Sequence, residues 1–528
     1  MMLRSTMSLD SWATLPATTL DGIRSRAVAH EADSRRLIPL FRRLDLGHAI
    51  VLGVIGASVA SNSGCLDQPR RRCMHYSGRH HIRLPWGHPR YRPLKGFAVR
   101  FLEHINKSWP HKKHRINNTA ADKTPAAVAL QCLMTFLPVD LDIVLLEFNS
   151  MARHQLAKLH AIEGIVRQLA SLASQPVLII VSVHSWCLAN FVVKVETEAN
   201  RVCQQYGIVC LSQRRALEPL VQSGNLTRQQ LVGKDCIHPV NGPLGVSSVT
   251  EMLTSWFDRA HHQYRQHQLA SSSDKEHQWV VALPAPLWPA NALPTRSRCY
   301  AFSTPTAYIV APSSLGQQIR PLRWLTAWCA QQGPWLVGGM NLGASTLESL
   351  HSPACFAPTI EARTSLVCPE AIIRSGGAEY EKFLAAPPSS FFYCRYEIRP
   401  PNAGPGKIST GVIALTPGAT LHFDVEAAVA QNRSSVTAHL SYLTSYQGMG
   451  MAILRCFGGC KCHDRVIDAH DIISDRDSVF QVAAVALNLR RHARCAMQLQ
   501  LLNQTSSGGH KFKVRLVTLD SSDVTSKS

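Results

Sequence analysis

The sequence predicts a chain of two parts: a parallel α/β domain followed by an antiparallel β domain. From residue 49 to about residue 260, short apolar runs alternate with helical patterns, which is typical of a doubly wound parallel sheet. After residue 298 the hydrophobic period changes to two, and Gly, Ser and Asn turns separate the segments, which is typical of a β-sandwich. A chain of 528 residues also exceeds one ordinary core, so its length favours two domains.

The first domain is expected to contain five strands with helices between them. The buried runs are 49–55, 142–148, 176–183 and 207–212, with a weaker run at 114–117. One helix face carries apolar residues at intervals of three and four, namely Leu156, Leu159, Ile162, Val166 and Leu169. Ligands of such sheets bind at the carboxyl ends of the strands. We therefore expect Ser58 and Asn149, which follow two of these runs, at one rim.

The second domain is predicted from segments with alternating hydrophobicity. They read TLHFDVEA, SVTAHLSYLTSY, GMAILRC, MQLQLL and HKFKVRLVTL. The composition changes along the chain give the boundaries. We expect a tail at 1–46, the αβα domain at 47–262, a polar and Pro-rich linker at 263–298 and the β-sandwich at 299–528.

The chain is basic, with a formal charge of +20 and an isoelectric point near 9.5. Much of this charge lies within 70–95 and 107–115, which attracts anionic surfaces in principle. These stretches contain no regularly spaced aromatic residues and no nucleic-acid module, so a solvated basic loop is expected and no nucleic-acid partner. No apolar run approaches the ~20 residues of a transmembrane helix. The sequence leaves the oligomeric state open.

The cysteines cluster in the second domain, where CFGGCKC contains Cys456, Cys460 and Cys462, and Cys495 follows. Disulfides are the favoured interpretation, and zinc stays an alternative because two histidines, His463 and His470, are near. No cofactor is expected. The cysteine cluster favours the secretory pathway or the extracellular space, although the amino end lacks an apolar signal-peptide region. Sequons at five positions agree with this location: Asn106, Asn117, Asn225, Asn432 and Asn503.

The stretch GKDCIHPVNGPLG contains Asp235 and His238 three residues apart. The same spacing occurs in three other pairs, Asp45/His48, Asp258/His261 and Asp274/His277, so the spacing alone has little weight. Only this pair is followed by a proline, which restricts the histidine to extended backbone angles, and by glycines that permit a turn into a helix. In this setting the carboxylate can orient the imidazole, and the imidazole can act as base toward a serine.

Two residues at the rim complete this chemistry. Ser58 is either a helix cap or a nucleophile whose Oγ is exposed beside a helix amino end. Asn149 is likewise either a cap or the donor of an amide N–H to an oxyanion. The Asp235–His238 turn favours the catalytic interpretation of both.

Three blocks, GASVA (56–60), LLEFN (145–149) and GKDCIHPVNGPLG (233–245), resemble the SGNH or GDSL-type hydrolase superfamily. The stretch INKSWPHKKHRINNTAADKTPAA (105–127) resembles the second block of an algal and plant subset, and the C-terminal half resembles the β domain attached to some of those proteins. The resemblance implies a flavodoxin-like αβα sandwich and a serine esterase without a cofactor. It assigns the nucleophile and an oxyanion N–H to Ser58, the oxyanion amide to Asn149, the orienting carboxylate to Asp235 and the base to His238.

The sequence departs from the family pattern at two positions. Ala57 replaces the aspartate that usually follows the glycine of the first block, which affects no catalytic role. Lys123 stands about where the second block has a glycine whose N–H completes the oxyanion hole. A lysine N–H can donate there unless the loop needs the positive φ that glycine allows.

The expected function is therefore hydrolysis of carboxylic esters, with O-acetyl groups on carbohydrate as the candidate substrate. Two alternatives stay open. One is a weak or inactive SGNH-like protein whose β domain binds glycan, and the other is an O-acyltransferase that uses the same serine.

Overall fold

The computed structural model describes residues 17–61, 96–121, 123–152, 159–186, 189–233, 237–240, 244–270, 281–288, 297–301, 308–310, 391–398, 407–425, 435–471, 478–489 and 495–520. The chain forms two compact units. The first unit consists of Met1–Ala126, Phe136–Pro294 and Pro305–Pro321, and the second of Ala127–Thr135, Thr295–Thr304 and Leu322–Ser528. The basic stretch 70–95 lies outside the described residues.

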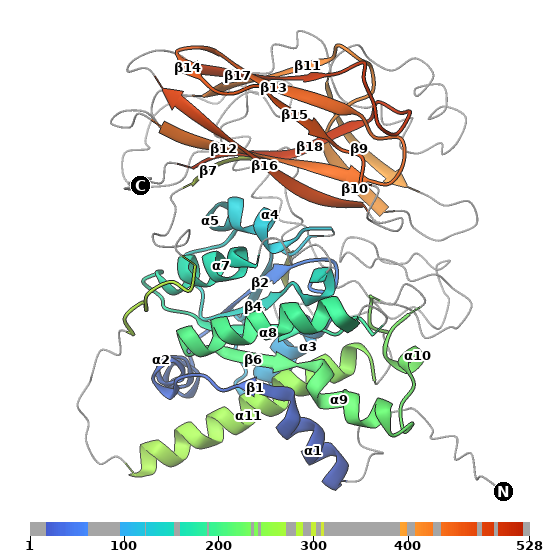
Figure 1. The fold of residues 1–528 in the computed structure, drawn as a ribbon. Helices are drawn as coiled ribbons and strands as arrows, with labels where there is room; N and C mark the ends of the chain where they lie inside the picture. Colours follow the sequence, from blue (N-terminus) through green and yellow to red (C-terminus); the bar gives the residue numbers. More distant parts are fainter. Residues whose placement is uncertain are drawn as a thin grey trace, which may run out of the picture. The chain divides into compact units, whose positions relative to one another are not determined.

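The first unit contains a seven-stranded sheet with the order β1-β6-β5-β4-β2-β3-β8. Strands β1, β6, β4 and β2 of this sheet are labelled in Figure 1. Its five central strands are parallel: β3 (Arg115–Asn118), β2 (Val51–Gly56), β4 (Ile143–Glu147), β5 (Val177–Ser182) and β6 (Val209–Ser212). Two short edge strands, β1 (Val28–His30) and β8 (Tyr308–Val310), are antiparallel to their neighbours. The order of the parallel strands is that of flavodoxin-like folds, so the predicted fold class of the first domain is confirmed.

Helices cover both faces of this sheet. One face is covered by α1 (Ala17–Ala27), α2 (Ser34–Asp45), α3 (Phe97–Ser108), α9 (Gln213–Gln222) and α11 (Val246–Ala270), which share one hydrophobic core with Leu52, Val54 and Leu145. The alternate residues of the strands face α7 (His160–Ala170) and α8 (Ala189–Tyr206). The shorter helices of this unit are η2 (Asn149–Met151) and α10 (Arg228–Leu231), whereas α4 (Ala126–Gln131) and α5 (Leu133–Phe136) belong mostly to the second unit. The predicted helix face corresponds to α7, except that Leu156 lies outside the described residues.

The prediction of a tail at 1–46 is wrong for residues 17–45. These residues form α1, β1 and α2, and β1 pairs with β6 at the edge of the sheet. Helix α2 buries Leu37, Leu40, Phe41 and Leu44 against the first core. The segment looks like a tail in the sequence because its exposed face is rich in arginine.

The predicted linker at 263–298 is also shorter than expected. Helix α11 continues to Ala270, eight residues past the expected boundary at 262. Residues 281–288 lie against α7 and α8, where their main chain bonds to side chains of these helices. Strand β7 (Ser297–Ala301) then pairs in the second unit.

The second unit contains two antiparallel sheets packed as a sandwich (Figure 1), as predicted. The larger sheet has the order β14-β16-β12-β18-β10-β9, with β7 on β18, and the smaller has the order β11-β17-β13-β15. The strands are β9 (Phe392–Ile398), β10 (Lys407–Ala414), β11 (Thr420–Val425), β12 (Ser435–Ser445), β13 (Met451–Gly458), β14 (Cys460–Lys461), β15 (Arg465–Asp468), β16 (Ser478–Leu489), β17 (Cys495–Leu501) and β18 (Phe512–Asp520).

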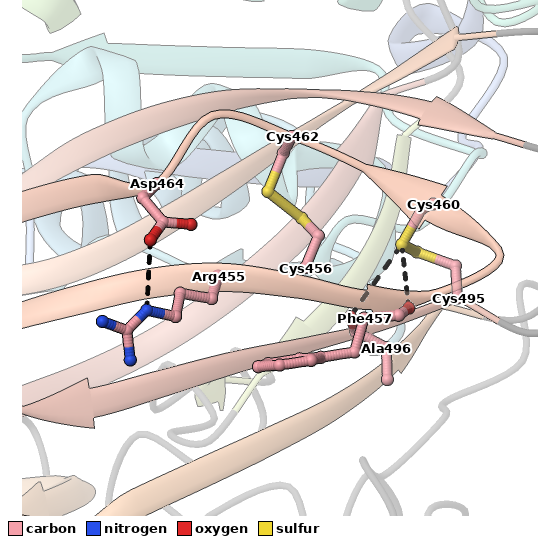
Figure 2. The surroundings of a disulfide bond; sticks show 8 residues. All are labelled: Arg455, Cys456, Phe457, Cys460, Cys462, Asp464, Cys495 and Ala496. Carbon is pink, nitrogen blue, oxygen red and sulfur yellow. Dashed lines mark hydrogen bonds and ion pairs between the residues drawn. A yellow bond between two sulfur atoms is a disulfide. The ribbon is translucent and has the colours of Figure 1, made fainter.

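Two disulfides connect the cysteine cluster of this unit (Figure 2). Cys460 in β14 bonds to Cys495 in β17, which joins the larger sheet to the smaller one. Cys456 in β13 bonds to Cys462. The predicted oxidation of these four cysteines is confirmed.

A third disulfide joins Cys203 in α8 to Cys210 in β6 within the first unit, and the sequence analysis missed it. No helix in the described ranges is both long enough and apolar enough to cross a bilayer.

Candidate active site

Ser58 lies directly after β2, in a single helical turn. The turn is closed by the Ser61 N–H, which donates to the Ala57 carbonyl at 3.0 Å, and by the Ser61 hydroxyl, which donates to the Ser58 carbonyl at 2.8 Å. Gly56 allows this turn to approach β4, because a Cβ at that position would lie 2.2 Å from the Glu147 carbonyl oxygen. The end of β2 that leads into the Ser58 turn therefore lies very close to the carboxyl end of β4.

His238 reaches Ser58 from a tight turn before α11. The turn is held by the Gly233 N–H, which donates to the His238 carbonyl at 2.9 Å, and by a bridge between Val232 and Pro239. The Nε2 atom of His238 lies 2.7 Å from the Ser58 Oγ. Both side chains are buried, each 5% exposed. The structure thus joins two residues 180 positions apart that the sequence analysis paired as nucleophile and base.

For steric reasons, the position that follows this turn, residue 245, requires a glycine. A Cβ at Gly245 would lie 1.9 Å from the Val240 carbonyl oxygen, so a larger residue would displace the chain just before α11 begins. Asp235 and Gly242 lie outside the described residues, and the orienting role of Asp235 stays a prediction.

In the other Asp-x-x-His motifs that the structure describes, the aspartate contacts a histidine from another segment of the chain. Asp45 contacts His261, at 3.2 Å from its Nε2, and Asp258 contacts His104 at 2.7 Å. Asp274 and His277 lie outside the described residues. The turn chemistry around His238, and not the spacing, therefore identified the histidine that meets a serine.

Asn149 begins η2 directly after Phe148 at the end of β4, next to β2 in the sheet. This is the point where the strand order reverses, the usual place for ligands in such folds. The side chain is buried, and its Nδ2 donates one long bond of 3.4 Å to the Val183 carbonyl. An amide nitrogen has a second hydrogen, which is the group that the oxyanion role requires.

Lys123 has a φ of 59°, in the left-handed region that favours glycine. A lysine therefore takes a backbone conformation here that glycine adopts more easily. The sequence analysis treated a positive φ as incompatible with a donating N–H, and the structure shows that the lysine adopts it.

Sequence reasoning missed Asn118, at the end of β3. Its Nδ2 donates to the Ala60 carbonyl at 2.8 Å, and its Oδ1 accepts the Ala120 N–H at 3.0 Å. It thereby connects the turn that carries Ser58 to the loop that leads to Lys123. The neighbouring Asn117, named above as a sequon, is buried in β3.

Glu147 was missed as well, although a charged residue inside the apolar run LLEF is a visible signal. Its side chain is fully buried, and burial raises its pKa to about 7. Hydrogen bonds from Ser150, the proximity of His238 and the Ala60 N–H oppose this rise.

The whole chain resembles solved structures of esterases. The structure of a two-domain esterase active on acetylated mannans has a TM-score of 0.51 and 12% identity, and the match covers 94% of this chain and 98% of that chain. A two-domain esterase co-crystallised with mannopentaose has a TM-score of 0.49 and 13% identity, with 94% and 97% covered. A family 3 carbohydrate esterase of Clostridium thermocellum has a TM-score of 0.27 and 11% identity, with 42% and 98% covered. No family model and no curated protein sequence matches the chain.

The first of these likenesses shows that both units share one two-domain fold with an esterase. At 12% identity it says nothing about individual residues. The fold implied by the SGNH resemblance is confirmed.

Proposed function

We propose that this chain is a serine esterase that removes O-acetyl groups from carbohydrate. The observation that carries the proposal is the 2.7 Å contact between the His238 Nε2 and the Ser58 Oγ at the point where the strand order reverses. The esterase chemistry of the solved neighbour, which acts on acetylated mannans, supports the class of substrate.

In this mechanism the Ser58 hydroxyl donates its proton to the His238 Nε2 as Oγ attacks the acetyl carbonyl. The resulting oxyanion is held by the Ser58 N–H and the Asn149 amide, with the Lys123 N–H as the third donor. His238 then returns the proton to the departing sugar hydroxyl, which leaves acetyl-Ser58. Water, deprotonated by the same histidine, releases acetate. Asp235 would orient the imidazole through Nδ1.

The test combines labelling with turnover. The full chain is treated with a fluorophosphonate probe and mapped by peptide mass, and acetate release is measured from p-nitrophenyl acetate and from acetylated mannan. The probe should modify Ser58, and Ser58→Ala should lose roughly 10⁴-fold or more in turnover. The control is Ser61→Ala, the other serine of the same turn, which should keep the label on Ser58.

Other results would overturn the proposal. If the wild-type protein takes no label and releases no acetate but binds mannan, it is a glycan-binding protein. If it takes the label and transfers acetyl groups to added oligosaccharide faster than to water, it is an O-acyltransferase.

A further inference from the structure

The peptide group between Val183 and His184 lies just past the carboxyl end of β5 and makes a hydrogen bond on each side. Its carbonyl oxygen accepts from the Asn149 Nδ2 at 3.4 Å. Its N–H, which belongs to His184, donates to the Gln213 Oε1 at 3.0 Å. One peptide group therefore connects the amide expected to bind the oxyanion with the side chain of Gln213.

Gln213 extends this connection toward α11. It is the first residue of α9, directly after β6, and β6 lies beside β5 in the sheet. Because a main-chain N–H can only donate, the Gln213 amide must present its oxygen to His184 and its nitrogen on the other side. There the Nε2 donates to the Ser248 Oγ at 2.8 Å. The Gln213 side chain thus bridges the end of β5 and the first turn of α11.

Ser248 is bonded in turn to the segment that follows His238. Its hydroxyl donates to the Gly245 carbonyl at 2.7 Å. The N–H of the next residue, Val246, donates to the Val240 carbonyl at 2.9 Å. The amino end of α11, to which Gln213 is bonded, is therefore fixed to the turn that carries the candidate base.

The bonds from Asn149 to Gly245 form one buried series, in which each group donates to the next in the same direction. Val183, His184, Gln213 and Ser248 are each at most 3% exposed. Hydrogen bonds in such a series polarise one another, and water does not replace a lost member in a buried site. The orientation of the 183–184 peptide therefore depends on the Gln213 amide.

We propose that Gln213 is a positioning residue of this site: it anchors the 183–184 peptide to α11 and thereby holds the Asn149 amide, so that one amide hydrogen is bound to the protein and the other is directed at the oxyanion. The inference rests on the proposed function, because the oxyanion is that of ester cleavage. Gln213 touches no reacting atom and acts through Asn149.

The kinetic test uses Gln213→Met, which keeps the length of the side chain but removes both hydrogen bonds. The oxyanion contact matters mainly in the transition state, so kcat on p-nitrophenyl acetate should fall about tenfold while KM stays within about twofold. An unchanged kcat would overturn the proposal.

The matched control is Ser212→Ala, at the residue before Gln213. Ser212 is also fully buried, donates to the Glu196 Oε1 at 2.8 Å and accepts the Arg215 N–H at 3.0 Å. These bonds lead to α8 and α9 and not to Asn149. Both variants should lower the midpoint of thermal unfolding, but Ser212→Ala should keep kcat within about twofold. An equal loss of kcat in both would show general destabilisation and would contradict the proposal.

A double variant tests whether Gln213 acts through Asn149. In an Asn149→Ala background the group that Gln213 orients is gone, so adding Gln213→Met should change kcat by less than about twofold. A further tenfold loss in the double variant would show an independent route and would overturn the proposal.

A last measurement needs no ester turnover. The full chain is labelled with ¹⁵N-asparagine, and the side-chain amide signal of Asn149 is assigned by its loss in Asn149→Ala. Because its hydrogen-bond acceptor moves, this signal should shift in Gln213→Met and stay in place in Ser212→Ala.

This measurement separates the two proposals. An unchanged Asn149 signal in Gln213→Met would overturn the positioning role even in an active esterase. A shifted signal in a protein without esterase activity would uphold the link between Gln213 and Asn149 and reject the proposed function.

Discussion

Two buried glutamates of the first unit, Glu147 and Glu163, have very different surroundings. Both are fully buried. Glu163, on α7, accepts the Tyr206 hydroxyl at 2.7 Å and two consecutive main-chain N–H groups, those of Leu287 and Trp288. Glu147 accepts two hydrogen bonds from Ser150, one from its N–H and one from its hydroxyl.

The side chains around Glu163 hold residues 281–288 in place by hydrogen bonds. Arg167, one turn further along α7, donates to the same Tyr206 hydroxyl and to the Pro284 carbonyl, so two side chains of α7 hold residues 281–288. In the part of the chain that the structure describes, the bonds to the Glu147 carboxylate come from Ser150 in the next turn, and burial raises the pKa of this acid to about 7. Glu147 and Glu163 are equally buried, so it is their hydrogen-bond partners that distinguish a structural acid from an acid suited to a functional site.

The largest effect is expected from Glu163→Gln. The amide nitrogen of glutamine would face an N–H donor, and the charge that accepts three hydrogen bonds would be lost. We expect the free energy of unfolding of the first unit to fall by about 3–4 kcal/mol, measured by urea denaturation at pH 7. A loss below about 1 kcal/mol would mean that the contacts with residues 281–288 contribute little, and would remove the contrast with Glu147.

The same substitution at Glu147 should raise the free energy of unfolding at neutral pH and above, instead of lowering it. Its pKa is raised to about 7, so the folded state prefers the neutral acid, and its contribution to stability is complete below pH 4.5 and is lost as the pH rises through 7. A pKa of 7 in place of 4.5 corresponds to about 3 kcal/mol.

Relative to the wild type, Glu147→Gln should therefore gain up to about 3 kcal/mol between pH 4.5 and pH 8, measured by urea denaturation across that range. Equal pH dependence of the two proteins would show that Glu147 does not titrate in this window.

A smaller effect on the free energy of unfolding is expected from relieving backbone strain at two positions. Among the described residues, the non-glycine residues with positive φ are Lys123, near the site, and Gln175, before β5. Glycine at either position should raise the free energy of unfolding by about 1 kcal/mol, because a side chain is unfavourable in the left-handed region.

Lys123→Gly should also keep kcat within about threefold, because the main chain already has the glycine conformation. A tenfold loss in Lys123→Gly but not in Gln175→Gly would assign a role in turnover to the lysine side chain itself.

The smallest effect is expected where a carboxylate stays in solvent. Asp258 contacts His104 at 2.7 Å, and its side chain is 54% exposed. His104→Gln should change the free energy of unfolding by about 0.5 kcal/mol or less and leave turnover unchanged, because water screens the pair. A loss above about 2 kcal/mol would show that exposure does not separate this acid from the two buried ones.

The sequence by itself determined the elements with a strong local pattern. Runs such as 142–148 and 176–183 are buried on both faces of a parallel sheet, so their apolar character is continuous and visible. The proline and glycines around His238 fix the backbone locally, and they identified the histidine that reaches Ser58. The clustered cysteines of CFGGCKC were likewise near enough in the sequence to indicate disulfides.

Only the tertiary structure decided the features that depend on distant partners. Residues 17–45 join the first unit because α2 meets a core built from α3 and α11, and no local pattern contains that core. Lys123 takes a positive φ because of the loop that surrounds it, not because of its own preference. Glu147 and Glu163 are both single acids in extended or helical runs, and their surroundings differ because the fold pairs one with Gly56 in the sheet and brings residues 281–288 to the other. Local periodicity fixes the elements, whereas the pKa and partners of a buried acid depend on chain segments that only folding brings together.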